Sequence, residues 1–158
     1  TITCSWERGK VSKTVQVGYA PEKLFNLVKD IEKYPEFLPW CQTLSIQNRE
    51  MTEREEILLA DMVIGFKIFR ERFTSRVIAR PCLEGMPYRI DVMYLEGPFK
   101  FLKNHWVFNS IKNGTEIDFF VNFEFRNIIM EKVIGIVFTE AVDKMVSAFE
   151  DRARTVYG

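Results

Sequence analysis

The sequence predicts an α+β fold in which a curved antiparallel sheet of about seven strands wraps around a long C-terminal helix. Alternating apolar and polar residues mark one strand near the start and several more between about residues 43 and 125. Short turns separate these later strands, which is typical of antiparallel neighbours. A long apolar stripe over residues 127–156 is the one segment large enough to cover the apolar face of such a sheet.

Length and charge favour one soluble domain, residues 1–158. Lysine plus arginine and aspartate plus glutamate number 22 each, so net charge gives no general attraction to nucleic acid. No apolar run approaches the roughly 18 residues of a membrane span. The first ten residues lack the apolar core of a secretory signal, although the missing initiator methionine leaves a longer precursor open.

Cysteine and histidine usage argues against a metal site or catalysis. Cys4, Cys41 and Cys82 are odd in number and far apart, which favours a reducing compartment over a disulfide framework. No metal-ligand spacing is present, and the single histidine, His105, has no recognisable nucleophile motif beside it. We therefore expect no catalytic residues, no metal and no catalytic cofactor.

The N-terminal third contains a strand, a helix and an unusual connection. Residues 11–17 alternate as a strand does, and Pro21 suits the first turn of a helix over residues 19–31. The segment "EKYPEFLPWC", residues 32–41, then carries two prolines among large apolar side chains. Because prolines spaced in this way break an ordinary helix, we expect a short second helix or a bent loop.

The middle of the chain contains strands and turns. The pair Asn113-Gly114 favours a tight hairpin, and Gly65 marks a bulge or bend between two long strands. The predicted strands span residues 53–64, 66–80, 88–96, 103–111 and 116–125.

The last predicted element is one long helix over residues 127–156, weakened locally at Gly135. Ile128, Ile129 and Ile136 fall partly outside its inward stripe, and this excess suits contact with a membrane or a second subunit, or packing under residues 32–41. The inward stripe is predicted to comprise Met130, Val133, Ile134, Val137, Ala141, Met145, Ala148 and Phe149.

Five short segments, in this order and spacing, carry a family resemblance. The segments are "DIEKYPEFLPWC" (30–41), "RERF" (70–73), "LEGPFKFLKNHWVF" (95–108), "NFEFRN" (122–127) and "MVSAFEDRA" (145–153). From about Val11 to Gly158 the chain resembles the START-like helix-grip superfamily, and within it the coenzyme Q-binding protein family. That family joins mitochondrial ubiquinone chaperones to bacterial ribosome-association toxins, and some members of the superfamily are polyketide cyclases.

The resemblance implies a binding protein, not an enzyme. We expect a polyprenyl quinone, a ubiquinone-like lipid, in a cavity between sheet and helix, and a lipid chaperone that supports respiratory electron transport and quinone biosynthesis. One alternative is a protein that binds the large ribosomal subunit and inhibits translation initiation, and a second is a cyclase-like enzyme. The expected location is the bacterial cytoplasm, peripheral to the inner membrane, or the mitochondrial matrix and inner membrane in a eukaryote.

Cavity candidates are large apolar residues with inward parity or positions implied by the resemblance, each with ordinary core packing as its alternative. Glu71 also has inward parity and is a candidate polar contact to a quinone carbonyl. The apolar candidates are Phe37, Leu38, Trp40, Phe69, Phe73, Leu95, Phe99, Trp106, Phe119, Phe123, Val133, Val137 and Met145.

An arginine stripe, Arg70, Arg72, Arg76 and Arg80, has the opposite parity and is expected on the outer face of the sheet. Anionic lipid headgroups or ribosomal RNA are its candidate partners. The favoured interpretation is a solvated face balanced by carboxylates on neighbouring strands.

Overall fold

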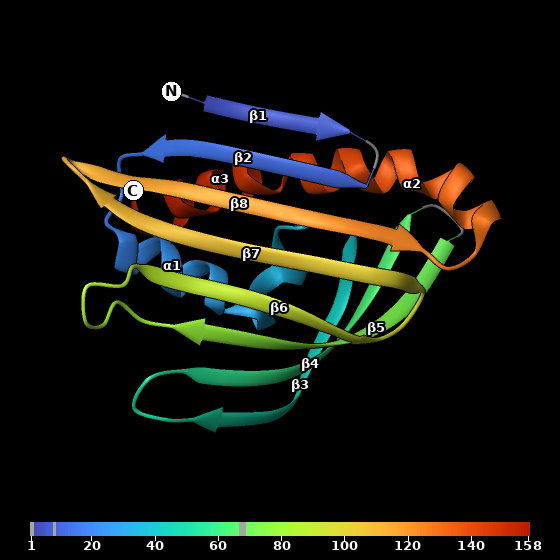
Figure 1. Cartoon of the computed structure of the whole chain (residues 1–158), viewed down its shortest axis with the longest axis horizontal. Helices are drawn as coiled ribbons and strands as arrows, with labels where there is room; N and C mark the ends of the chain where they lie inside the picture. The colour runs from blue at the N-terminus through green and yellow to red at the C-terminus, as the bar shows by residue number, and fades with distance from the viewer. Residues whose placement is uncertain (1, 8, 67–68) are drawn as a thin grey trace.

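The computed structural model describes residues 2–7, 9–66 and 69–158, and the side chains of residues 9–65 and 69–158. In this part of the chain, eight strands form one antiparallel sheet against which three α-helices and a 3₁₀ helix pack (Figure 1). The predicted α+β fold is therefore confirmed. The elements are β1 (Ile2–Glu7), β2 (Lys10–Val17), α1 (Pro21–Lys29), η1 (Ile31–Glu36), β3 (Cys41–Met51), β4 (Glu56–Phe66), β5 (Phe69–Arg80), β6 (Tyr88–Glu96), β7 (Phe99–Ile111), β8 (Gly114–Phe125), α2 (Ile128–Asp143) and α3 (Met145–Tyr157).

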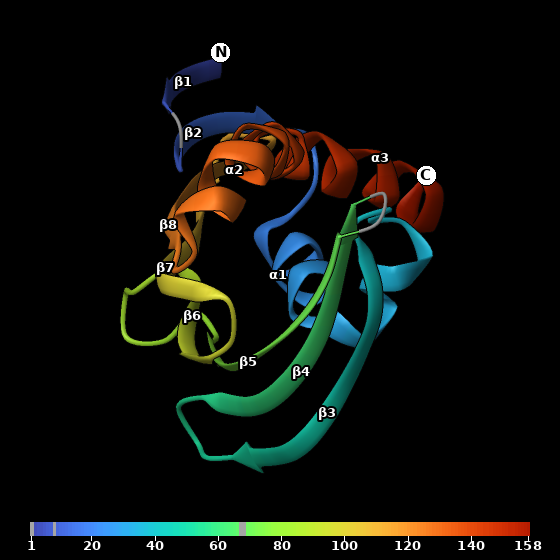
Figure 2. The same ribbon diagram turned by 90° about the vertical axis from the view of Figure 1, so that its right-hand side faces the viewer.

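The sheet brings the two ends of the chain together. Its strand order is β1-β2-β8-β7-β6-β5-β4-β3, so β2 pairs with the last strand and β3 forms the far edge. Figure 2 shows the sheet curving from β2 and β8, beside α2, round to β3 and β4. This curvature lets a single sheet enclose the helices on its apolar face.

The strands differ from the sequence prediction at three points. The edge strand β1 adds one strand to the predicted number, and β3 begins directly after Trp40. Gly65 is not a bend: it lies within β4, paired with Arg70, and its N–H donates to the Trp40 carbonyl at 3.0 Å. A Cβ on Gly65 would overlap the side chain of Gln42, so glycine permits this close approach. Residues 67 and 68 of the predicted strand 66–80 lie outside the described residues.

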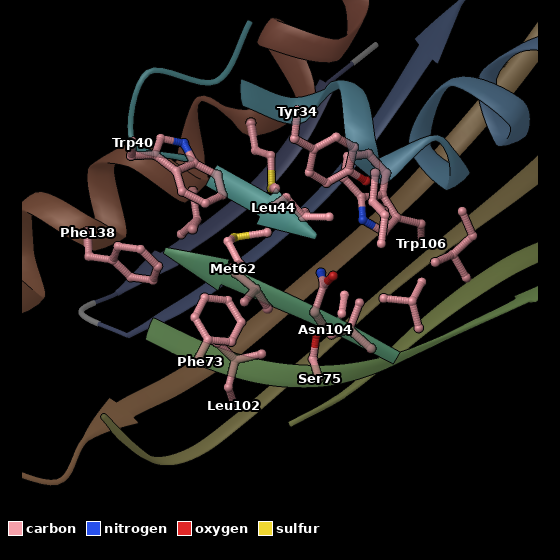
Figure 3. A pocket seen from close by; sticks show the side chains of 18 residues that line it. Tyr34, Trp40, Leu44, Met62, Phe73, Ser75, Leu102, Asn104, Trp106 and Phe138 are labelled. Carbon is pink, nitrogen blue, oxygen red and sulfur yellow. The ribbon is translucent and has the colours of Figure 1, made fainter. Parts of the chain in front are cut away.

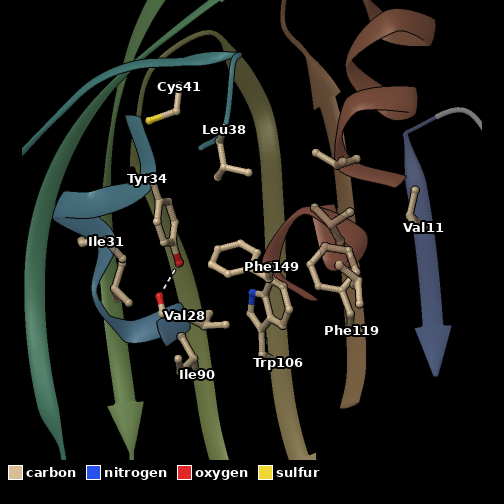
Figure 4. Packing of buried hydrophobic residues seen from close by; sticks show 14 of the residues in the cluster. Val11, Val28, Ile31, Tyr34, Leu38, Cys41, Ile90, Trp106, Phe119 and Phe149 are labelled. Carbon is tan, nitrogen blue, oxygen red and sulfur yellow. Dashed lines mark hydrogen bonds between the residues drawn. The ribbon is translucent and has the colours of Figure 1, made fainter. Parts of the chain in front are cut away.

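Two turns and connections agree with the sequence. Asn113 has a φ of 64° between β7 and β8, as the predicted tight hairpin requires. The segment after α1 forms the 3₁₀ helix η1 with Pro35 inside it, which is the short-helix alternative. The Tyr34 hydroxyl donates to the Val28 carbonyl and ties η1 to α1 (Figure 4).

The predicted C-terminal helix is two helices, and its predicted inward stripe is only partly correct. Val133 and Val137 are exposed, whereas the other predicted members pack in or against the core: Met130, Ile134, Ala141, Met145, Ala148 and Phe149. The break is at Lys144, where ψ is −1°, and not at Gly135. In α2 the buried residues are Gly135, Phe138, Thr139 and Val142. The apolar surface of α2 extends so far round the helix that the sequence pattern alone does not define the inward direction.

One buried hydroxyl defines that direction. Thr139 Oγ1 accepts a hydrogen bond from the Gly9 N–H at 2.9 Å and donates to the Gly135 carbonyl at 2.6 Å. Thr139 is completely buried, so water has no access to either group. The contact joins α2 to the start of β2 and orients Phe138 and Val142 toward the sheet.

We predict that Thr139→Val lowers the free energy of unfolding by about 1–3 kcal/mol, because the nearly isosteric valine leaves the buried Gly9 N–H without an acceptor. Urea denaturation measures the change. Thr155→Val is the matched control, since Thr155 makes the same kind of bond to the Asp151 carbonyl on an exposed face of α3. Equal stability of both variants would contradict the orienting role of Thr139.

Candidate ligand-binding cavity

An apolar cavity of about 80 Å³ lies between the inner face of the sheet and the helices (Figure 3). We call it the inner cavity. Six strands (β3 to β8), η1, α2 and the start of α3 contribute to its wall. Its lining residues are Ile31, Tyr34, Trp40, Leu44, Ala60, Met62, Phe73, Ser75, Val77, Ile90, Val92, Leu102, Asn104, Trp106, Val121, Phe138, Val142 and Met145.

A second space, the outer groove, lies beside the inner cavity and has a volume of about 360 Å³. Trp40 and Met145 line both spaces, so these two side chains stand between them. The remaining residues of the groove are Leu38, Pro39, Gly65, Ala141, Lys144 and Ala148. The groove therefore adjoins the inner cavity near the break between α2 and α3.

Five predicted cavity residues reach one of these spaces. Trp40, Phe73, Trp106 and Met145 line the inner cavity, and Leu38 lines the outer groove. The segment 32–41 thus contributes side chains both to the hydrophobic core and to the cavity wall, which are the two alternatives given for its apolar residues.

Four predicted phenylalanines pack beside the cavity without lining it. The rings of Phe99 and Phe123 pack against each other with centroids 5.8 Å apart. Phe69 packs against Phe125, which belongs to the same aromatic cluster. Phe119 packs edge-on against Trp106 at 4.6 Å. The expectation that these four line the cavity is wrong, because neighbouring rings fill the space in front of them.

Phe37 is also outside the cavity. Its ring packs edge-on against Tyr34 and Phe149, with centroid distances of 5.9 and 5.0 Å. The Arg152 guanidinium lies over the ring at 5.1 Å. These contacts hold Phe37 on the α3 side of η1, away from the wall.

The prediction that Leu95, Val133 and Val137 line the cavity is also wrong, because the structure places these three side chains on the surface. Leu95 is 43% exposed, since Tyr94 is the inward residue at that end of β6. Val133 and Val137 are 68% and 45% exposed, because Thr139 turns the adjacent face of α2 to the sheet.

The exposed face of α2 is a continuous apolar strip, which we call the α2 strip: Ile128, Ile129, Val133, Ile136 and Val137. All five side chains are at least 45% exposed. The alternative that the excess apolar residues pack under residues 32–41 is therefore wrong. Val137 lies one turn before Ala141 of the outer groove, so the strip and the groove are neighbours on α2.

Glu71 and His105 do not reach the cavity. Glu71 has the predicted inward parity but is half-buried and absent from the lining. His105 stacks on Phe120 with ring centroids 5.2 Å apart. Its pKa is lowered, first by partial burial and then by Arg89, which favours the neutral form.

Sequence reasoning missed two polar lining residues, Ser75 and Asn104. Strand parity contained the signal, because Ser75 lies between Phe73 and Val77 on the inward face and Asn104 is two residues before Trp106. The predicted lining was limited to large apolar residues and Glu71, so it contained neither Ser75 nor Asn104.

Burial also suppresses ionisation at the η1 end of the cavity. The pKa of Tyr34 is raised far above its usual value, mainly by burial and further by Cys41 and Asp30. Burial likewise raises the pKa of Cys41 to about 12. Both groups are therefore neutral at physiological pH, in keeping with an apolar site.

The arginine stripe lies on the outer face of β5, but only part of it is neutralised. Arg80 forms ion pairs with Glu55 and Asp91 at 3.1 and 2.7 Å. Such pairing with carboxylates of neighbouring strands was the favoured interpretation for all four arginines. Arg70, Arg72 and Arg76, the β5 arginines, are exposed and have no carboxylate partner among the described residues. Their cross-strand neighbours include Val63, Leu59 and Met93, so no acidic residue stands directly opposite Arg72 or Arg76.

Among the described residues, no group of three or more histidine, cysteine, aspartate or glutamate side chains is arranged to hold a metal ion. None of the helices formed by those residues is long and apolar enough to cross a membrane.

Comparison with known proteins agrees with this architecture. A family model described as "Polyketide cyclase / dehydrase and lipid transport" matches residues 17–150. The chain is 43% identical over 138 residues to the "Ribosome association toxin RatA" of Rickettsia prowazekii, covering 87% of this chain and 91% of that protein. It is 26% identical over 157 residues to the "Coenzyme Q-binding protein COQ10 homolog B, mitochondrial" of Xenopus laevis, covering 96% of this chain and 61% of that protein.

A solved START superfamily protein from Mycobacterium smegmatis has the same fold, with a TM-score of 0.72 at 18% identity over 93% of this chain and 98% of that one. The helix-grip arrangement expected from the sequence is thereby confirmed. The chain belongs to the polyketide cyclase / dehydrase and lipid transport family and has a START-like fold.

Proposed function

We propose that the protein binds an isoprenoid quinone-like lipid in the inner cavity and serves as a lipid chaperone for respiratory electron transport and quinone biosynthesis. The observation that carries this proposal is the apolar cavity, separated from an apolar groove by the side chains of Trp40 and Met145. The coenzyme Q-binding name of one relative supports it.

The volume of the inner cavity requires it to open for this ligand. A cavity of about 150 Å³ is enough for benzene, whereas the inner cavity measures about 80 Å³. The outer groove, at about 360 Å³, is within the range of roughly 300–1,000 Å³ typical of small-molecule sites. Displacement of Met145, a side chain with three rotatable bonds, together with Trp40 would join the two spaces and admit a substituted ring with part of its tail.

The driving force would be the removal of apolar surface from water, at about 0.8 kcal/mol for each buried CH₂ group. A polyprenyl tail longer than the joined space would leave through the outer groove. The α2 strip adjoins that groove and offers the tail and the protein a common apolar surface.

We therefore propose that the α2 strip rests on a lipid bilayer during ligand exchange. Its five side chains are exposed to a degree that water does not favour. Lys132 and Arg126 are exposed beside it, at and just before the start of α2, where they suit anionic headgroups. A second copy of the chain is the competing occupant.

A second candidate function, binding of the large ribosomal subunit, is favoured by the β5 arginines. Three exposed guanidinium groups that have no carboxylate partner within the described part of the chain suit phosphate contacts. The name of the RatA relative supports this candidate. The cyclase alternative has weaker support, because Glu71, the carboxyl predicted to have inward parity, does not line the inner cavity.

For the lipid function we predict that Ala60→Leu lowers affinity for a short-tailed ubiquinone at least tenfold while the protein remains folded. Ala60 is a small residue in the wall of the inner cavity, and leucine would occupy the ligand space. Calorimetric titration measures the affinity. Val63→Leu, on the opposite face of β4, is the control and should bind as the wild type does. Unchanged binding by a folded Ala60→Leu variant would place the ligand elsewhere.

For the bilayer contact we predict that the double variant Ile129→Gln, Val133→Gln reduces flotation with phosphatidylcholine–phosphatidylglycerol vesicles about tenfold. Both side chains are 68% exposed, so their loss should not disturb the core. Val156→Gln, at an apolar site that is 50% exposed on α3, is the control. Unchanged flotation would exclude the strip as the membrane contact, and a change in oligomeric state instead would assign it to a second copy.

For the ribosome function we predict that Arg72→Ala with Arg76→Ala weakens co-sedimentation with large ribosomal subunits and reduces the slope of log affinity against log salt by about 1–2. Arg54→Ala is the control, because Arg54 is exposed but paired with Glu84. The same salt slope in both variants would show that the β5 arginines contact no phosphate.

A further inference from the structure

Two polar side chains interrupt the apolar wall of the inner cavity, and each presents an oxygen that has no hydrogen-bond partner among the described residues. Ser75 is 5% exposed and lines the cavity from β5. Among the described residues, its hydroxyl has no hydrogen-bond partner. Asn104 lines the cavity from β7, and Figure 3 shows both side chains directed into the cavity.

The Asn104 amide has a defined orientation. Its Nδ2 donates to the backbone carbonyl of Phe120 on β8 at 2.8 Å. The reversed amide would place two acceptor oxygens against each other, so Oδ1 is held on the side away from Phe120. No donor among the described residues reaches Oδ1. The Tyr34 hydroxyl, which also lines the cavity, is already engaged with the Val28 carbonyl.

This arrangement distinguishes a ligand that carries a hydrogen-bond donor from a ligand that carries only acceptors. The Ser75 hydroxyl can donate to a quinone carbonyl or to a phenol oxygen alike. Asn104 Oδ1 can only accept, so it is satisfied by a ligand hydroxyl and left unpaired by a quinone carbonyl. An unpaired acceptor in an apolar cavity carries an energetic penalty.

We propose that Ser75 and Asn104 form a polar recognition point that selects a hydroxyl-bearing ring, a phenol or quinol, over the corresponding quinone. This inference rests on the proposed lipid-binding function. The ring lies against β5 and β7 at the recognition point, and the tail passes Trp40 and Met145 into the outer groove. The protein would thus take up the reduced or phenolic form of its lipid in preference to the oxidised form.

The test is an anaerobic calorimetric titration of the full chain with the quinol and the quinone forms of a benzoquinone that carries one isoprene unit. We expect the wild type to favour the quinol by about 2- to 10-fold, the effect of one neutral hydrogen bond. Asn104→Leu should bring the two affinities together. Asn109→Leu on the outer side of the same strand, where Asn109 donates to Asp118 at 3.1 Å, should keep the preference.

A second measurement needs no variant. The dimethyl ether of the same quinol keeps both ring oxygens but loses the donating hydrogens, and the wild type should bind it no better than the quinone. Equal affinity for quinol and quinone, or a preference that persists in a folded Asn104→Leu variant, would overturn this inference and leave the proposed lipid binding intact. Failure of the folded wild type to bind any of the three ligands would overturn both.

Discussion

The hydroxyl of Thr139 determines the rest of this architecture, because it selects the face that α2 turns to the sheet. Its two hydrogen bonds connect the Gly9 N–H before β2 to the Gly135 carbonyl within α2. With that face directed inward, Phe138 and Val142 close the inner cavity. Val133 and Val137 are then left in water, where they form part of the α2 strip. A helix with an apolar surface on most sides needs such a polar contact to define one orientation.

The abundance of phenylalanine is explained by packing more than by ligand contact. The chain contains 14 phenylalanines, and among those with described side chains only Phe73 and Phe138 line the inner cavity. Phe99, Phe123 and Phe125 pack around Phe138 with centroid distances of 5.7, 4.9 and 5.9 Å. This aromatic cluster fills one end of the space between sheet and helices. Trp40 also packs edge-on against Phe138 at 6.0 Å, so the cluster extends to a side chain that separates the inner cavity from the outer groove.

A single strand serves both proposed functions. Alternate residues of β5 point to opposite faces of the sheet, so Phe73, Ser75 and Val77 line the inner cavity while Arg72 and Arg76 are exposed on the outer face. Relatives with names that refer to coenzyme Q and to the ribosome therefore do not require two different folds. The proposed lipid site and the candidate phosphate-binding site occupy separate faces of one sheet.

The sequence by itself determined the class of fold, the strand parities and the hairpin at Asn113, because each depends on local periodicity or on the backbone of one or two residues. Parity also placed Phe73 correctly on the inward face and the arginines on the outer face, and the family resemblance placed Trp106 in the cavity wall. Tertiary structure alone decided which inward residues meet a cavity: Phe119 and Phe123 have the correct parity, yet neighbouring rings cover them. It also decided the rotation of α2, because a hydrogen bond between residues 130 positions apart has no signature in local sequence.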